Sequence, residues 1–169
     1  SDGTFGLGHE LHGTPAGWIQ TDSFYERPEF SLNANVRLDY NPIKDLQLSA
    51  IGAYTYTNIE ERKYRSTMKL AGDRLLGPSE LRHKMDKTIY KTFQATAEYN
   101  KTINGHSFGI LAGYSWEQED YRYIQGSRDK FPGNDLPYIN AGSPDNQKSE
   151  GSGNAWAIPV SYTHLTLPT

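Results

Sequence analysis

The chain alternates between apolar and polar residues over four long stretches. The clearest stretch runs from Phe30 to Tyr40, where every second residue is apolar and every residue between is polar or charged. A repeat of two residues is the pattern of a strand with one apolar and one polar face. With isolated exceptions, the same pattern predicts strands at about 30–40, 46–57, 88–100 and 106–119. We therefore expect an all-β fold.

The connections between these strands alternate between short and long. Asn41-Pro42 and Asn104-Gly105 lie in short connections with turn composition, whereas about 58–87 and 121–155 are long and rich in charged or small residues. Outer-membrane β-barrels have short periplasmic turns at one rim and long extracellular loops at the other. The strand lengths also suit the roughly 9–11 residues that a tilted strand needs to cross a bilayer. The pattern predicts antiparallel strands of a transmembrane outer-membrane β-barrel.

Aromatic residues of the apolar face fall near the two ends of the expected strands. This is where membrane barrels carry girdles of rings that lie half in lipid and half in water. The periplasmic set is Tyr40, Tyr99 and Phe108, and the extracellular set is Phe30, Tyr54, Tyr56, Tyr114 and Trp116. A soluble antiparallel sandwich would use the same alternation for its core, so that architecture stays open.

A barrel orientation gives each face a predicted environment. The residues expected to touch lipid are Leu32, Ala34, Val36, Leu38, Leu48, Ala50, Ala95, Ala97, Ile110 and Ala112. The residues expected to face the lumen or a plug are Asn33, Asn35, Arg37, Gln47, Ser49, Thr92, Gln94, Thr96 and Glu98.

Composition narrows the function classes. The 169 residues include 12 Tyr and no Cys, and their formal net charge is -3. This composition excludes a disulfide scaffold and gives no general attraction to nucleic acid. No run of 18 or more apolar residues exists to cross a membrane as a helix. Nothing at Ser1 resembles a signal peptide, so we expect the chain to begin inside a larger protein.

Several segments together resemble a known family. The stretch 127–143, SRDKFPGNDLPYINAGS, with YSWE at 114–117 before it and Trp156-Ala157 after it, is similar to a signature of SusC/RagA-type TonB-dependent outer-membrane transporters of Bacteroidetes. YNPIKDL at 40–46 and EYNK at 98–101 resemble the short barrel turns of that family. The resemblance covers roughly residues 30–158.

The resemblance implies a partial barrel, over 1–159, of a longer transporter whose plug domain is absent from this chain. Members of the family lie in the outer membrane, in contact with membrane lipid. They import oligosaccharides or peptides with a SusD-like surface lipoprotein, and they are driven through TonB, which contacts an N-terminal region that this chain lacks.

The last ten residues need a separate interpretation. Residues 160–169, VSYTHLTLPT, are identical to one reading frame of a transposase adapter used in sequencing libraries. We therefore expect an adapter-derived tail that does not continue the strand opened by Trp156-Ala157-Ile158. The other interpretation is a genuine β-rich tail.

Candidate chemistry is sparse. His9, Glu10 and His12 lie close in sequence, but their spacing and the flanking glycines do not match a zinc-protease helix. We expect no catalytic residue, no cofactor and no metal site.

The best candidates for contact with substrate or partner are four residues of the second long loop: Arg128, Asp129, Asp135 and Tyr138. We expect Arg128 to organise this loop by bridging carbonyls or Asp135. Residues 121–139 are expected to pack a small ordered cluster around Pro132-Gly133, and 143–154 to be mobile.

Three function classes remain. The leading one is a fragment of an outer-membrane nutrient transporter. The alternative is a soluble carbohydrate-binding β-sandwich module, whose Tyr and Trp rings would stack on sugars. The third is an outer-membrane enzyme, which would need a convergent catalytic site that the sequence does not provide.

Overall fold

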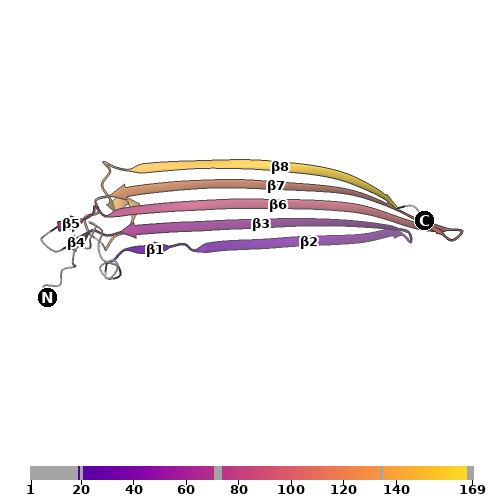
Figure 1. Ribbon diagram of the computed structural model, residues 1–169, viewed down its shortest axis with the longest axis horizontal. Coiled ribbons are helices and arrows are strands. Elements are labelled where there is room, and N and C mark those ends of the chain that lie inside the picture. The colour runs from indigo at the N-terminus through magenta and orange to yellow at the C-terminus, as the bar shows by residue number, and fades with distance from the viewer. Residues whose placement is uncertain (1–18, 20, 71–73, 134, 167–169) are drawn as a thin grey trace, which may run out of the picture. The chain divides into compact units, whose positions relative to one another are not determined.

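Five long strands dominate the computed structural model, which describes residues 19, 21–70, 74–133 and 135–166. They are β2 (Glu29–Ile43), β3 (Leu46–Arg65), β6 (Glu80–Ile103), β7 (His106–Asp129) and β8 (Lys148–Thr166). The short elements are β1 (Phe24–Glu26), β4 (Met68–Leu70), β5 (Arg74–Leu76) and a 3-10 turn, Ile139–Ala141. The long strands are neighbours in one sheet, as Figure 1 shows. The predicted all-β fold is confirmed.

The sheet follows the chain order, as expected for a wall made of successive hairpins. Its order is β1-β3-β6-β7-β8, and β2 also pairs with β3. β1 is antiparallel to the end of β3, where Phe24 lies opposite Tyr64, and β4 and β5 form a separate two-stranded antiparallel sheet. None of the described residues belongs to a helix long and apolar enough to cross a membrane.

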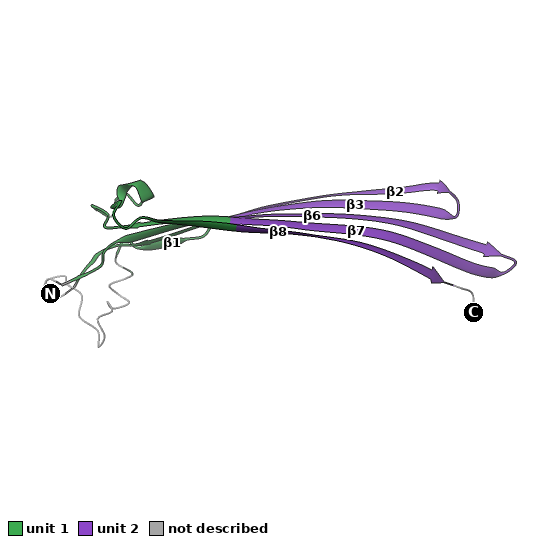
Figure 2. Ribbon diagram, turned by 90° about the horizontal axis from the view of Figure 1, so that it is seen from above, with its two compact units in different colours: residues 1–29, 59–86, 123–152 green, residues 30–58, 87–122, 153–169 purple. Residues whose placement is uncertain are grey.

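The chain divides into two compact units, which Figure 2 colours separately. Unit 1 comprises 1–29, 59–86 and 123–152, and unit 2 comprises 30–58, 87–122 and 153–169. Unit 2 holds the alternating segments, and unit 1 holds the connections between β3 and β6 and between β7 and β8.

Tight turns close the two hairpins within unit 2. Only Lys44 and Asp45 separate β2 from β3, and only Asn104 and Gly105 separate β6 from β7. Asn104 has φ 52° and Gly105 has φ 84°. Positive φ at both positions suits the twist of a two-residue hairpin, and Asn-Gly is the pair that tolerates it best. The turn predicted at Asn104-Gly105 is confirmed.

The strands extend beyond the ranges that alternation predicts, so both long loops are shorter than expected. β3 continues to Arg65 and β6 begins at Glu80, while β7 continues to Asp129 and β8 begins at Lys148. The predicted loops 58–87 and 121–155 are therefore wrong in extent. The alternation of apolar and polar residues fades in these extensions, although the backbone remains in the sheet. Loss of a buried apolar face removes the sequence signal without ending the strand.

The structure also corrects two expectations for the end of the chain. β8 runs without interruption to Thr166, so the strand opened at Trp156 does continue into 160–166. Lys148–Asn154 belongs to the same strand, which contradicts the predicted mobility of that part of 143–154. The proposed adapter origin of 160–169 concerns its source and stays a prediction.

The two faces of unit 2 separate by chemistry, as the alternation predicts. On the polar face, Thr55 donates a hydrogen bond to Asn33 Oδ1 at 2.9 Å. On the apolar face, aromatic rings pair across neighbouring strands, with ring centroids 6.3–6.5 Å apart: Phe30–Tyr56, Phe93–Tyr114 and Tyr99–Phe108. Such cross-strand pairs stabilise the register of a sheet.

Candidate functional site

An aromatic cluster in unit 1 joins three segments that are distant in the sequence. Tyr64, near the end of β3, is 2% exposed. Its ring lies 5.7 Å from Phe24 of β1 and 5.6 Å from Phe131, the latter edge-on at 89°. Burial raises the pKa of the Tyr64 phenol above its ordinary value. Met68 and Leu81, at 2% and 1% exposed, are the other buried apolar residues of the described chain.

Two buried serines connect the same segments through hydrogen bonds. The Ser66 amide donates to Ser23 Oγ at 3.0 Å. The Phe131 amide donates to Ser79 Oγ at 2.9 Å, and the Lys130 amide donates to the Ser79 carbonyl at 3.0 Å. The connection between β3 and β6 is therefore fixed to the start of the connection between β7 and β8. The two predicted loops form one ordered platform.

Arg128 lies at the end of β7 and crosses the second connection. Its Nη1 donates to the Gly142 carbonyl at 3.3 Å, and its Nη2 donates to Gln147 Oε1 at 2.9 Å. The bridging of a carbonyl matches the geometry expected for this residue. Asp135 is not a partner of Arg128 in the described contacts, because Gln147 takes the second arm of the guanidinium.

Asp129 also contacts the connection between β7 and β8. Its carbonyl accepts a hydrogen bond from the Ser143 amide at 2.8 Å, and its Oδ2 accepts one from Asn146 Nδ2 at 3.0 Å. Its Oδ1 is buried and has no partner among the described residues. Arg128 and Asp129 together hold 142–147 against the end of β7.

The other two candidates lie apart from these contacts. Asp135 is exposed, and Tyr138 is 65% exposed. Leu136, at 58% exposed, likewise stays outside the aromatic cluster. The expected packing of 121–139 around Pro132-Gly133 is therefore corrected. Phe131 packs on the buried ring of Tyr64 in β3 instead.

The apolar face of unit 2 contains a groove of about 510 Å³. It is lined by residues of β2, β3, β6 and β7, including Leu38, Tyr40, Leu48, Ala50, Ala95, Ala97, Ala112 and Tyr114. Large apolar side chains of β2 on this face are open, including Val36 at 63% and Leu38 at 67% exposed. A continuous exposed apolar surface of this kind requires an apolar environment or partner.

The polar face of unit 2 holds an aromatic and acidic group that alternation did not single out. Tyr90 donates a hydrogen bond to Glu117 Oε2 at 2.9 Å. Trp156 Nε1 donates to Glu119 Oε1 at 3.3 Å, and the Tyr90 and Trp156 rings are 6.3 Å apart. The carboxylates therefore hold both rings on the polar side. The sequence prediction opened a strand at Trp156 but gave it no neighbouring strand, so these contacts were missed.

The structure offers no candidate metal centre in the part of the chain that it describes. No group of three or more His, Cys, Asp or Glu residues is arranged to hold an ion there. His9, Glu10 and His12 lie outside the described residues.

Known proteins show the same sheet. No family model matches the chain. A curated relative named TonB-dependent receptor P3, from Formosa agariphila, is 24% identical over 143 residues, which cover 83% of this chain and 14% of the relative. Two structures of the RagAB peptide importer, in its 'closed-closed' and 'open-open' states, are each 20% identical, with TM-scores of 0.83 and 0.82.

These matches define what the likeness covers. The structural alignments cover 95% and 94% of this chain but 18% of each matched chain. The chain therefore spans less than a fifth of the proteins to which it is similar. The resemblance to SusC/RagA-type TonB-dependent transporters is confirmed, and the fold is that of a segment of their barrel. The matched proteins are receptors and transporters.

Proposed function

We propose that this chain forms part of the wall and extracellular rim of a TonB-dependent nutrient transporter in the outer membrane. The observation that carries the proposal is the sheet itself. It has one apolar face in unit 2, and it aligns along nearly its whole length with a peptide importer. The apolar face suits contact with lipid, because membrane barrels place apolar side chains outward and polar ones inward.

The platform in unit 1 would lie at the extracellular rim. Its aromatic cluster and the Arg128 contacts give a shaped surface, which suits contact with a SusD-like lipoprotein or with an entering oligosaccharide or peptide. The similar RagAB structures are those of a peptide importer, which favours peptides as substrates. Energy would reach the transporter through TonB and an N-terminal region of the whole protein. Arg128, Asp129, Asp135 and Tyr138 would contribute contacts or loop order, with no catalytic role and no cofactor.

The alternative, a soluble carbohydrate-binding sandwich, lacks support from the described residues. A sandwich needs a second sheet packed face to face with the first. The second sheet described here consists of β4 and β5, with three residues each. Such a sheet is too small to cover the apolar face of unit 2.

The proposal is tested on the full-length gene in its source bacterium. We expect the protein in the outer-membrane fraction, and a deletion strain that loses uptake of fluorescent peptide or oligosaccharide mixtures and regains it on complementation. A protonophore should abolish uptake in the complemented strain, because TonB depends on the inner-membrane proton gradient. A soluble location, or unchanged uptake of all mixtures after deletion, would contradict the proposal.

A further inference from the structure

A basic groove lies on the polar side of β3 and β6 in unit 1. It has a volume of about 240 Å³ and is lined by Lys63, Arg65, Glu80 and Arg82. Lys63 and Arg65 are two residues apart on β3, and Glu80 and Arg82 are two apart on β6, so each pair shares one face of its strand. Three cations thus face one carboxylate, in a chain with a formal net charge of -3.

Two of these cations have no internal partner. Arg65 pairs with Glu80 at 3.3 Å and also donates to the Pro78 carbonyl at 3.4 Å. Lys63 and Arg82 are exposed, and neither makes an ion pair or hydrogen bond with a described residue. Their charge is therefore available to a ligand.

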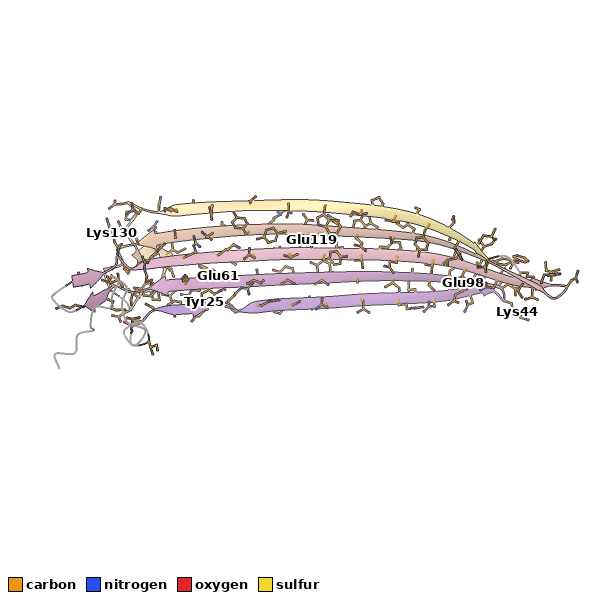
Figure 3. All side chains as sticks on the ribbon, in the orientation of Figure 1. Tyr25, Lys44, Glu61, Glu98, Glu119 and Lys130 are labelled. Carbon is orange, nitrogen blue, oxygen red and sulfur yellow. The ribbon has the colours of Figure 1, made fainter. Side chains whose placement is uncertain are left out.

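The nearest acid along β3 is already engaged. Glu61, two residues before Lys63, accepts a hydrogen bond from the Tyr25 hydroxyl at 3.3 Å. Figure 3 shows Tyr25 on β1 close to Glu61 on β3. This contact directs the Glu61 carboxylate toward β1, on the side of β3 away from β6. Glu61 therefore does not neutralise the cations of the groove between β3 and β6.

A second groove continues the basic surface toward β8. It has a volume of about 440 Å³, shares Arg65 and Glu80 with the first, and adds the exposed Lys148 from the start of β8. Arg128 and Asp129 also line it, but their contacts close the loop described above. Lys148 therefore adds a third cation without a partner in the described chain, on the same side as Lys63 and Arg82.

The placement of the free cations indicates the form of ligand that fits. Lys63, Arg82 and Lys148 belong to three strands of one sheet, in which neighbouring strands are about 4.8 Å apart. A ligand that reaches all three cations must carry several negative charges spread along an extended chain. We propose that this groove binds extended peptides that carry several Asp or Glu side chains. The proposal rests on the transporter function, and it assigns that function a substrate class.

The test measures peptide binding by the full-length transporter, purified in detergent, with fluorescence anisotropy. The probe is a labelled octapeptide of alternating Glu and Thr. An octapeptide of alternating Gln and Thr removes the charge. The variant carries both Lys63→Gln and Arg82→Gln. Arg27→Gln is the matched control, because Arg27 is an exposed cation of unit 1 that lines neither groove.

We expect the Glu peptide to bind more tightly than the Gln peptide. The double variant should weaken its binding about two- to thirty-fold, as expected for two exposed ion pairs, and added salt should shrink the difference. The Gln peptide should be unaffected, and Arg27→Gln should bind like the wild type.

Three results would overturn the inference. The first is equal binding of the Glu peptide by the wild type and the double variant. The second is equal binding of the Glu and Gln peptides by the wild type. The third is that octagalacturonate binds more tightly than the Glu peptide and that the double variant loses this binding, which would assign the groove to anionic sugars. Uptake of the Gln peptide in cells separates the transporter function from the preference for acidic peptides. If uptake persists while the charge preference fails, the transporter function stands and only the substrate class is wrong.

Discussion

Val36→Arg, compared with Asn35→Arg, tests which face of the sheet meets lipid. The two residues are adjacent in β2 and point to opposite faces. The aromatic residues Phe30 and Tyr40 mark the expected ends of the membrane segment. Ten residues at about 3.3 Å each and a tilt of about 40–45° place these rings about 23–25 Å apart along the membrane normal, close to the apolar band of about 25 Å in such barrels. Val36 then lies within about 2–3 Å of the midplane.

The magnitude of the expected effect follows from this depth. An Arg on the lipid face at the midplane costs about 2–4 kcal/mol of folding free energy. That cost lowers the ratio of folded to unfolded barrel about 30- to 700-fold. An Arg at Asn35 would join the polar face near Arg37, which pairs with Asp39 at 2.8 Å. Repulsion between exposed like charges should cost less than about 1 kcal/mol.

The assay is urea unfolding of the full-length barrel refolded into phosphatidylcholine vesicles. The folded fraction is read from heat-modifiable gel mobility. Ala97→Arg and Thr96→Arg repeat the comparison in β6. A substitution on the polar face could also disturb a plug, so the comparison between the two faces is judged from both pairs of variants together. Equal loss of folded barrel from Val36→Arg and Asn35→Arg, repeated for Ala97 and Thr96, would refute lipid contact by the apolar face.

Three further predictions concern the platform and the isolated chain. Tyr64→Ala should destabilise the platform by about 3–5 kcal/mol, because it removes a buried ring, and should speed proteolysis within 130–147 without changing the mobility of the barrel on gels. Tyr64→Phe, which keeps the ring, should change little. Identical proteolysis of the two variants would disprove a packing role for the ring. Arg128→Ala should increase proteolytic cleavage at 142–147 and weaken uptake or lipoprotein association. Unchanged cleavage, uptake and lipoprotein association would show that the contacts of Arg128 are dispensable. The isolated chain should not form a monodisperse monomer without detergent, because β2 and β8 leave open edges beside an exposed apolar face; a sharp cooperative thermal transition of such a monomer would contradict this.

The sequence predicts the membrane-type segments well because one physical signal dominates them. Phe30–Tyr40 alternates without a miss, and the structure places it within β2. Asn104-Gly105 likewise specifies its own turn through backbone conformation. In both cases the signal is local, since it depends on neighbouring residues alone.

The platform was harder to predict because its contacts are not local. Tyr64 and Phe131 are far apart in sequence, and nothing in the pattern around either residue indicates the other. The strand extensions to Arg65 and Asp129 were also missed, because neither face there has the apolar repeat that alternation detects. Arg128 was identified by its chemistry, but the choice of Gln147 over Asp135 depends on how the loop closes.

The packing of Phe131 on Tyr64 bears on how new specificities could be built on this scaffold. Phe131 packs on the end of β3 and donates a hydrogen bond to Ser79 of the first connection, so a second connection transplanted alone from a relative would lack its matching neighbours. A graft that exchanges the two connections as a pair, together with the serines that tie them, keeps the interior matched. Length changes are tolerated best at positions outside that interior, such as the exposed stretch around Leu136 and Tyr138. The two connections of the platform are therefore exchanged best as a pair.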